Sequence, residues 1–156
     1  MVLSWVKTTW KKNSTTKIID RMWIHNDEEV TTIPEGCYGF VYKITNTESS
    51  REYIGKKLFY SMKQRQVKGK KKKYKTESDW QEYYGSNDQL LQDVELLGKE
   101  KFTRQILRLC KNKGECSYYE AKYQFELDVL LFPKLYYNVW TMCKIHRKHL
   151  QLTDAG

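Results

Sequence analysis

The clearest pattern of apolar and polar positions along the chain is that of a β-hairpin. Residues 38–46 are rich in β-branched and aromatic side chains, and residues 51–57 are similar in character after a short polar stretch at 47–50. Runs of this composition on either side of a polar turn are typical of paired strands. Residues 102–109 also alternate between apolar and polar and predict a third strand.

Two later segments have the spacing of amphipathic helices. Leucine and valine recur at helical intervals over residues 90–97, and Gly98 follows at the position where helices commonly end. Ser117 and Glu120 have the spacing of a capping box, in which both side chains bind the free backbone groups at a helix start. They predict a second helix that runs to about residue 131 and ends before Pro133.

In chain order, these elements predict an α+β domain. We expect a small three-stranded antiparallel sheet flanked by helices, with a short strand or ordered turn at residues 136–139. The domain is expected at residues 36–142, between an N-terminal extension (1–35) and a C-terminal tail (143–156). Residues 56–77 have no apolar face and predict a long loop within this domain.

The positive charge of the chain is concentrated in that loop. The 156 residues carry a formal net charge of +9, and residues 56–75 contain ten lysines and arginines but no aspartate or glutamate. The rest of the chain is therefore close to neutral. A segment of this charge density repels itself unless a polyanion neutralises it, which indicates nucleic acid as the partner. An anionic membrane surface and a merely solubilising charge run are the alternatives.

Composition excludes several other classes of protein. Hydrophobic residues make up 40% of the chain, which is not the composition of a disordered protein. No apolar run approaches the roughly 18 residues of a membrane span. The first residues contain no apolar stretch of signal-peptide length, so we expect a cytoplasmic protein without a membrane partner. The four cysteines lack the paired spacing of a zinc site.

Two tyrosines of the predicted hairpin stand out as candidates for chemistry. Tyr42 and Tyr53 are eleven residues apart, and with an even-numbered turn this odd separation places both side chains on one face of the sheet. Gly55 follows, and a glycine within a strand allows a backbone or a substrate to approach closely. Taken alone, the two tyrosines are more simply explained as packing residues.

Their context resembles a known motif. Residues 40–42 (FVY), a gap of ten residues and then residues 53–55 (YIG) resemble the GIY-YIG nuclease motif. Glu120 in the predicted helix and Asn138, eighteen residues later, match the later positions of that family. Together with the lysine-rich stretch, residues 79–87 (DWQEYYGSN) make the chain most similar to freestanding Seg-type, homing-like endonucleases of bacteriophages.

The chain departs from the motif at two positions. Phe40 replaces the first glycine of the motif, although Gly39 lies beside it. The family's arginine lies about ten residues beyond the second tyrosine, and Lys63 holds that position here. Arg65 follows two residues later. We assign the catalytic cation to Arg65, with Lys63 as the alternative.

The resemblance implies a DNA endonuclease that hydrolyses phosphodiester bonds with one divalent cation, Mg²⁺ or Mn²⁺, held by Glu120. It implies that Tyr42 takes the proton of the attacking water and that Tyr53 positions the water or the phosphate. Arg65 would stabilise the charge of the transition state, and Asn138 would hold the geometry of the site. A free phenol has a pKa of about 10, so a tyrosine base needs positive charge nearby.

Charge and resemblance together make double-stranded DNA the expected partner. Lysines in a flexible loop supply affinity and salt dependence but read little sequence. A homodimer on DNA would allow cleavage of both strands, because one such site handles one phosphodiester. The expected phosphate contacts are Lys56, Lys57, Lys63, Lys68, Lys70, Lys71, Lys72, Lys73 and Lys75.

Each assignment has a structural alternative. Glu120 could act only as a helix cap, and Asn138 could simply order a turn. For the whole chain, the alternative function is a non-catalytic nucleic-acid-binding module on the same fold, which would bind DNA without magnesium-dependent turnover. A membrane-surface or partner-binding protein is supported by the basic run alone, because that run lacks a hydrophobic face.

Overall fold

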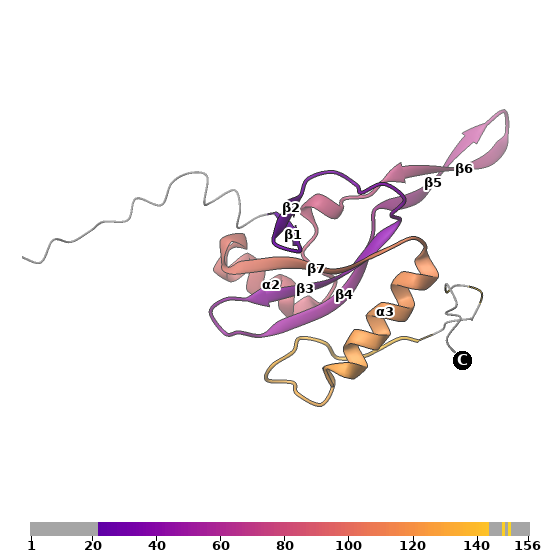
Figure 1. The fold of residues 1–156 in the computed structure, drawn as a ribbon. Coiled ribbons are helices and arrows are strands. Elements are labelled where there is room, and N and C mark those ends of the chain that lie inside the picture. Colours follow the sequence, from indigo (N-terminus) through magenta and orange to yellow (C-terminus); the bar gives the residue numbers. More distant parts are fainter. Residues whose placement is uncertain (1–21, 144–147, 149, 151–156) are drawn as a thin grey trace, which may run out of the picture.

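The structure, a computed structural model, describes residues 22–143, 148 and 150 (Figure 1). Its centre is a five-stranded sheet with the strand order β2-β1-β7-β3-β4. The strands of this sheet are β1 (Trp23–His25), β2 (Glu28–Val30), β3 (Gly39–Asn46), β4 (Glu52–Leu58) and β7 (Phe102–Cys110).

The three strands that the sequence predicts lie side by side in this sheet. β3 pairs antiparallel with β4 on one side and with β7 on the other. The observed ends of these three strands differ from the predicted ends by no more than one residue. The α+β class, the hairpin and the third strand are therefore confirmed.

The prediction of a three-stranded sheet is wrong, because residues 23–30 add two strands. β1 pairs parallel with β7, and β2 pairs antiparallel with β1. Each strand has three residues, too few for an alternating pattern to show in the sequence. The available signal was the turn between them, where Asn26 and Asp27 both have positive φ, at 49° and 66°. Asparagine and aspartate tolerate that conformation better than most residues.

Helix α2 (Asp88–Leu97) agrees with the predicted helix. The Asn87 side chain caps its start by accepting a hydrogen bond from the Leu90 amide at 2.9 Å. Gly98 ends it with φ of 93°, a conformation that favours glycine. The short 3₁₀ turns η1 (Trp80–Glu82) and η2 (Lys99–Lys101) precede and follow this helix.

Helix α3 (Lys113–Glu126) begins five residues earlier than predicted and ends earlier as well. Its true cap is Asn112, whose side chain accepts a hydrogen bond from the Glu115 amide at 2.9 Å. The Glu115 carboxylate in turn accepts one from the Lys111 amide at 3.0 Å. Ser117 lies inside the helix, so the predicted capping box is wrong. Residues 136–139 contribute only an isolated bridge, between Tyr136 and Glu52.

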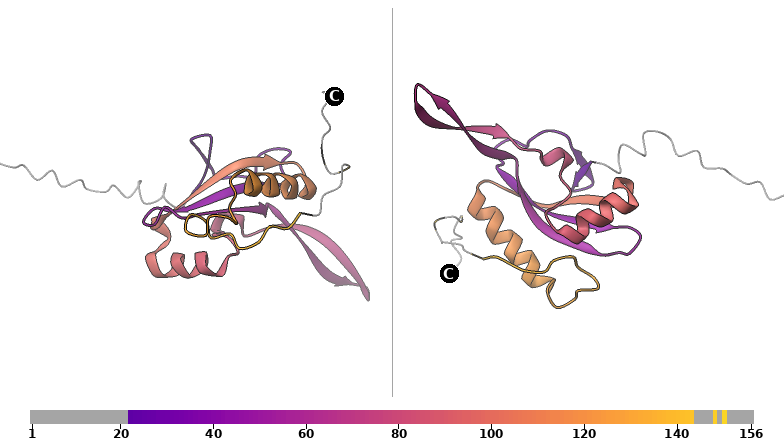
Figure 2. Two further views of the ribbon diagram at one scale, coloured as in Figure 1. Left: turned by 90° about the horizontal axis from the view of Figure 1, so that it is seen from below. Right: turned by 180° about the vertical axis from the view of Figure 1, so that it is seen from behind.

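The two helices cover opposite faces of the sheet, as Figure 2 shows. On the α2 side, Phe40, Tyr42 and Ile44 of β3 pack in one buried cluster with Leu90 and Trp80. On the α3 side, a second buried cluster joins Val41 and Ile54 to Cys116, Cys110 and Val129. Alternate residues of β3 therefore belong to different cores, as the two-residue period of a strand requires.

The expected basic loop is instead a two-stranded ribbon. β5 (Tyr60–Val67) pairs antiparallel with β6 (Lys70–Glu77) along their whole length, and the ribbon projects from the body of the molecule (Figure 1). The tight turn is formed by Lys68 and Gly69, with φ of 48° and 74°. The prediction of a loop is wrong because a ribbon exposed on both faces has no apolar side, and therefore no alternation to detect.

Candidate active site

A pocket of about 230 Å³ lies at the edge strand β4. It is bounded by β4, by α3, by the start of α2 and by the chain that follows α3. The residues that line it are Tyr53, Lys56, Ser86, Asn87, Glu120, Gln124, Asn138, Val139, Trp140 and Met142. Three residues assigned from the sequence to the catalytic site, Tyr53, Glu120 and Asn138, therefore meet at one pocket, together with Lys56.

The tyrosine pair lies on one face of the sheet, as the eleven-residue spacing predicts. In the register of β3 with β4, Tyr42 is opposite Gly55 and Tyr53 is opposite Ile44. The two phenol rings are 6.1 Å apart between centroids. A Cβ atom at Gly55 would lie 2.5 Å from the Tyr42 hydroxyl oxygen, so the Tyr42 side chain occupies the space that glycine leaves above β4.

The two tyrosines differ in their access to the pocket. Tyr42 has no exposed surface, whereas Tyr53 lines the pocket and its hydroxyl lies 3.2 Å from the Ser86 hydroxyl. Burial raises the pKa of Tyr42 well above its ordinary value, and the neighbouring phenols of Tyr83 and Tyr53 add to this. Burial also raises the pKa of Tyr53, and the hydrogen bond with Ser86 opposes that effect. Both raised pKa values make the loss of the phenol proton harder, and a tyrosine must lose that proton to act as a base.

Glu120 is the eighth residue of α3 and does not cap the helix. Its carboxylate points to β4, where it lies 3.0 Å from the Lys56 ammonium. That ammonium also donates a hydrogen bond of 2.9 Å to Ser117, one turn earlier on α3. Burial raises the pKa of Glu120, and the contact with Lys56 opposes the shift. The carboxylate is therefore a partly desolvated acceptor on the pocket wall.

Asn138 holds the backbone of β4. Its side-chain oxygen accepts a hydrogen bond from the Ile54 amide at 3.0 Å, and its amide nitrogen donates to the Ile54 carbonyl at 2.8 Å. Gln124 of α3 donates to the same carbonyl at 2.9 Å. Because β4 is an edge strand, these side chains supply partners that a neighbouring strand would otherwise provide. The role of Asn138 in holding the geometry of an active site stays a prediction, and Gln124 was not among the predicted residues.

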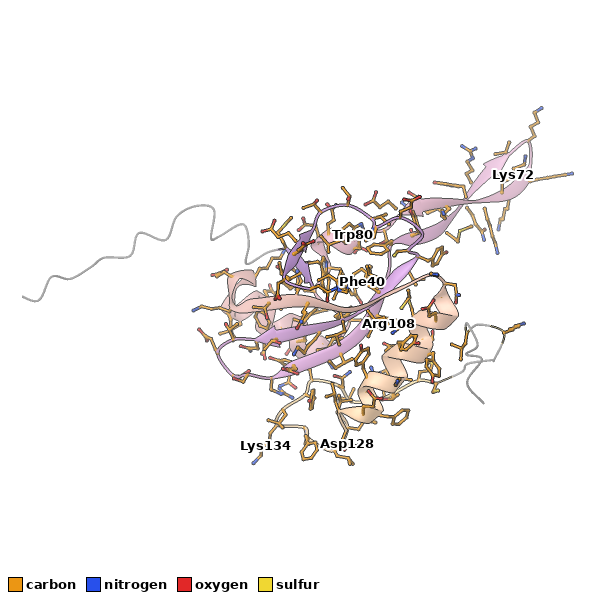
Figure 3. All side chains as sticks on the ribbon, in the orientation of Figure 1. Phe40, Lys72, Trp80, Arg108, Asp128 and Lys134 are labelled. Carbon is orange, nitrogen blue, oxygen red and sulfur yellow. The ribbon has the colours of Figure 1, made fainter. Side chains whose placement is uncertain are left out.

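The predicted catalytic cations lie on the ribbon, outside the lining of this pocket. Arg65 is paired in register with Lys72, which Figure 3 labels far out on the projecting ribbon. The Arg65 guanidinium lies over the ring of Tyr74, 5.5 Å from its centroid. Lys63 lines a second, open hollow together with Lys56, Lys57 and Asp79.

Lys57, which the sequence assigns to phosphate contacts, lies beside the tyrosine cluster. Its ammonium lies 2.6 Å from the Asp79 carboxylate and 3.9 Å from the centroid of the Tyr83 ring. The Tyr83 ring packs edge-on against Tyr42, with centroids 5.9 Å apart. The contact between Lys57 and Asp79 lowers the pKa of Asp79, chiefly through the hydrogen bond from Lys57. Tyr83 and Asp79 belong to the DWQEYYGSN segment, whose resemblance could have pointed to them.

The donor set at the pocket fits a hard divalent cation bound through one carboxylate. Within the described part of the chain, no group of three or more His, Cys, Asp or Glu side chains could enclose a metal ion. Besides Glu120, the oxygen-bearing side chains that line the pocket are those of Tyr53, Ser86, Asn87, Gln124 and Asn138. Mg²⁺ prefers oxygen and commonly keeps several water ligands, so one carboxylate beside a pocket suits it.

Comparison with known proteins yields one match. A family model described as "Putative endonuclease segE, GIY-YIG domain" matches residues 23–141. No curated protein and no solved structure matches the chain significantly. Across residues 22–143, 148 and 150, no helix has the length and apolar character needed to cross a membrane. The matched range starts at β1, so it includes the two strands that the sequence reading left in the N-terminal extension.

Proposed function

The chain belongs to the GIY-YIG endonuclease family through its SegE-type domain, and on that premise we propose that it is a Mg²⁺-dependent endonuclease of double-stranded DNA. The observation that carries the proposal is the pocket at the β4 edge. It brings together a pocket-facing phenol (Tyr53), a cation (Lys56), a lone carboxylate (Glu120) and the amide that fixes the strand (Asn138).

The reaction is hydrolysis of a phosphodiester. A water oxygen forms a bond to phosphorus and loses a proton, while the bond from phosphorus to the 3′ oxygen breaks and the leaving oxygen takes up a proton. Glu120 would hold the metal ion, and when bound that ion would supply positive charge to polarise the phosphate and to offset charge on the leaving oxygen. Mn²⁺ has the same oxygen preference and is expected to substitute.

The chain's own groups stabilise and orient the substrate. Tyr53 directs its hydroxyl into the pocket, where it can donate to a phosphate oxygen or align the water. Lys56 offers a positive donor 3.0 Å from Glu120, so it can bind a phosphate oxygen that enters the pocket. Asn138 and Gln124 hold the Ile54 peptide and thereby the YIG segment.

We assign Tyr42 a positioning role in this arrangement. Its hydroxyl has no contact with water, and its pKa is raised, so it is poorly suited to take a proton. It instead fills the space above Gly55 and packs against Tyr53 and Tyr83. The sequence-based assignment of Tyr42 as the base stays a prediction.

The ribbon and its lysines are proposed to hold DNA next to the pocket. Lys63 connects the two regions, because it lies on β5 and lines the hollow that Lys56 and Lys57 also line. Three further points stay predictions: a phage homing-type role in the host cytoplasm, a homodimer on DNA, and a nuclease domain at residues 36–142.

The first experiment compares wild type with Glu120→Gln on supercoiled plasmid, in Mg²⁺ or in EDTA. We expect wild type to nick or cut only with Mg²⁺, and Glu120→Gln to bind DNA without cutting. Glu126→Gln is the matched control, because Glu126 lies on the same helix but is exposed and pairs with Lys122. Cleavage by Glu120→Gln at the wild-type rate would refute the assignment of Glu120.

A second pair of variants separates the candidate cations. Lys56→Met should lower the cleavage rate at saturating DNA by on the order of 100-fold, the usual effect of losing one transition-state donor. Arg65→Met should weaken DNA binding and leave that rate nearly unchanged. The reverse result would return the catalytic cation to Arg65.

One observation favours the non-catalytic alternative. The Lys56 ammonium already neutralises Glu120, so the carboxylate has a partner without metal. Salt-sensitive DNA binding by wild type, with no cleavage in Mg²⁺ or Mn²⁺, would support that alternative.

A further inference from the structure

The ribbon of β5 and β6 contributes little to the core of the protein. From Met62 to Gln66 and from Lys70 to Lys75 every side chain is exposed. None of the ion pairs among the described residues includes a lysine or arginine of this ribbon. An isolated two-stranded hairpin is only marginally stable in water. We therefore infer that the ribbon serves to bind a partner and not to stabilise the fold.

The strand register divides the ribbon into two different faces. One face, which we call the glutamine face, carries side chains from cross-strand pairs such as Gln64 with Lys73 and Gln66 with Lys71. The opposite face carries Arg65 with Lys72 and Lys63 with Tyr74. On the glutamine face, the central positions of β5 are neutral amides and the cations come only from β6. On the opposite face, both strands carry cations.

This distribution distinguishes two kinds of DNA contact. Lysine and arginine neutralise phosphates without regard to sequence. A glutamine amide carries a donor and an acceptor side by side and can pair with the N6 and N7 atoms of adenine. Gln64 and Gln66 are alternate residues of one strand, so both amides point to the same side, about 7 Å apart along β5.

The dimensions of the ribbon favour the major groove. Two paired strands are about 4.8 Å apart, and with their side chains they are too wide for a minor groove of about 6 Å. The major groove of B-DNA, about 12 Å wide, admits a two-stranded ribbon. The lysines that β6 contributes to the glutamine face then lie beside a phosphate backbone that borders the groove.

We propose that the ribbon is a sequence-reading arm that enters the major groove of duplex DNA with its glutamine face toward the base edges. The proposal rests on the proposed endonuclease function, and it names what that function lacks, a source of base preference. Eight residues at about 3.3 Å each give an arm of about 26 Å, which spans about eight base pairs. The arm starts two residues after Leu58 ends β4, so the bases it reads lie within about one helical turn of the cleaved bond.

The test is a binding selection that does not depend on cleavage. Full-length Glu120→Gln protein is mixed, in EDTA, with a pool of duplexes carrying a random 16-base-pair segment, and bound duplexes are sequenced. The same selection is run with Gln64→Ala/Gln66→Ala added. The matched control adds Gln89→Ala/Gln92→Ala, which removes two exposed glutamines from α2 instead. Thermal unfolding of each variant verifies that it is folded.

We expect a short adenine-containing motif with the parent and the α2 control, and loss of preference at two positions when Gln64 and Gln66 are replaced. One amide-to-adenine pair is worth roughly a 5- to 100-fold preference. Replacing the selected adenines with 7-deazaadenine, which lacks the N7 acceptor in the major groove, should weaken parent binding by a similar factor. Duplex RNA should compete poorly, because its major groove is too narrow for side chains to read.

Three results would overturn the proposal. They are a motif unchanged by the Gln64 and Gln66 substitutions, indifference to 7-deazaadenine, and the absence of any motif with the parent. A motif lost in Lys70→Ala/Lys72→Ala but kept without the glutamines would assign reading to the opposite face and refute our orientation. Failure of the endonuclease function is seen separately, as wild type that selects a motif but does not cut it.

Discussion

Gly55→Ala is the substitution that tests most directly how the two tyrosines are arranged. The added Cβ would lie 2.5 Å from the hydroxyl oxygen of Tyr42, 2.7 Å from its Cζ and 2.9 Å from Cε1 of Tyr53. Contacts this short force one ring to move. Tyr42 has no free space, because it is completely buried and its ring packs on Trp23 at 5.2 Å and on Tyr83 at 5.9 Å between centroids.

The expected cost follows from this crowding. Adding a methyl group to a well-packed core destabilises a protein by about 1–3 kcal/mol. The strand itself does not require glycine at this position, because Gly55 is not among the glycines with positive φ. The cost therefore measures packing against the phenols and not backbone strain. Tyr53 is the ring with freedom to move, since it borders the pocket, and its displacement should also lower cleavage.

The assay combines urea unfolding with cleavage rates corrected for the folded fraction. Gly39→Ala is the matched control, because its Cβ would be as crowded, 2.8 Å from the Cys116 sulfur and from the Lys57 carbonyl, but away from the tyrosine rings. Both variants should lose stability, and only Gly55→Ala should lose cleavage per folded molecule. Wild-type stability in Gly55→Ala would refute the packing. Lost stability with normal cleavage would remove the tyrosine pair from the active site.

Two further predictions concern the groups around the pocket. Asn138→Ala leaves the buried Ile54 amide without its acceptor. The free energy of unfolding in urea should fall by about 1–3 kcal/mol. A fall below about 0.5 kcal/mol would contradict the role of Asn138 in holding β4. Lys57 lowers the pKa of Asp79, so the stability from this pair is present above the ordinary pKa and is lost as pH falls through the lowered one. The contribution of this pair to stability is small, because Asp79 is exposed. Asp79→Asn should flatten the loss of stability below about pH 4. An unchanged pH profile of stability would show that the contact does not form in solution.

The parts of the fold that the sequence predicts correctly have either a visible alternation of buried and exposed positions or a strand-like composition. Strand β7 and helix α2 have one buried and one exposed side, and their periodicity is visible in the sequence. Strand β3 is buried along most of its length, and its β-branched and aromatic residues predict it instead. The ribbon of β5 and β6 has two exposed faces, and β1 and β2 are three residues long. Periodicity cannot report on either case, because it records the contrast between a buried and an exposed side over several residues.

The candidate site was predictable where the motif fixes the spacing of its residues and not across the ribbon of β5 and β6. Tyr53, Glu120 and Asn138 reach one pocket, as their resemblance to the family motif implied. The catalytic cation was predicted from its distance along the sequence from Tyr53. That distance reaches into the ribbon, which places Lys63 and Arg65 away from the pocket lining. Lys56 lies only three residues after Tyr53, so its position does not depend on the ribbon.

The position of β4 at the sheet edge explains why this strand supplies two of the pocket's polar groups. Successive side chains of a strand point to opposite faces, so Tyr53 faces the α2 layer and Lys56 faces α3. Only at an edge can both faces contribute to one pocket, because no further strand separates them. β3 is interior, so its Tyr42 is covered on both sides and reaches over Gly55 toward the edge. The same geometry that buries the first tyrosine of the motif therefore leaves the second as the phenol that can meet a phosphate.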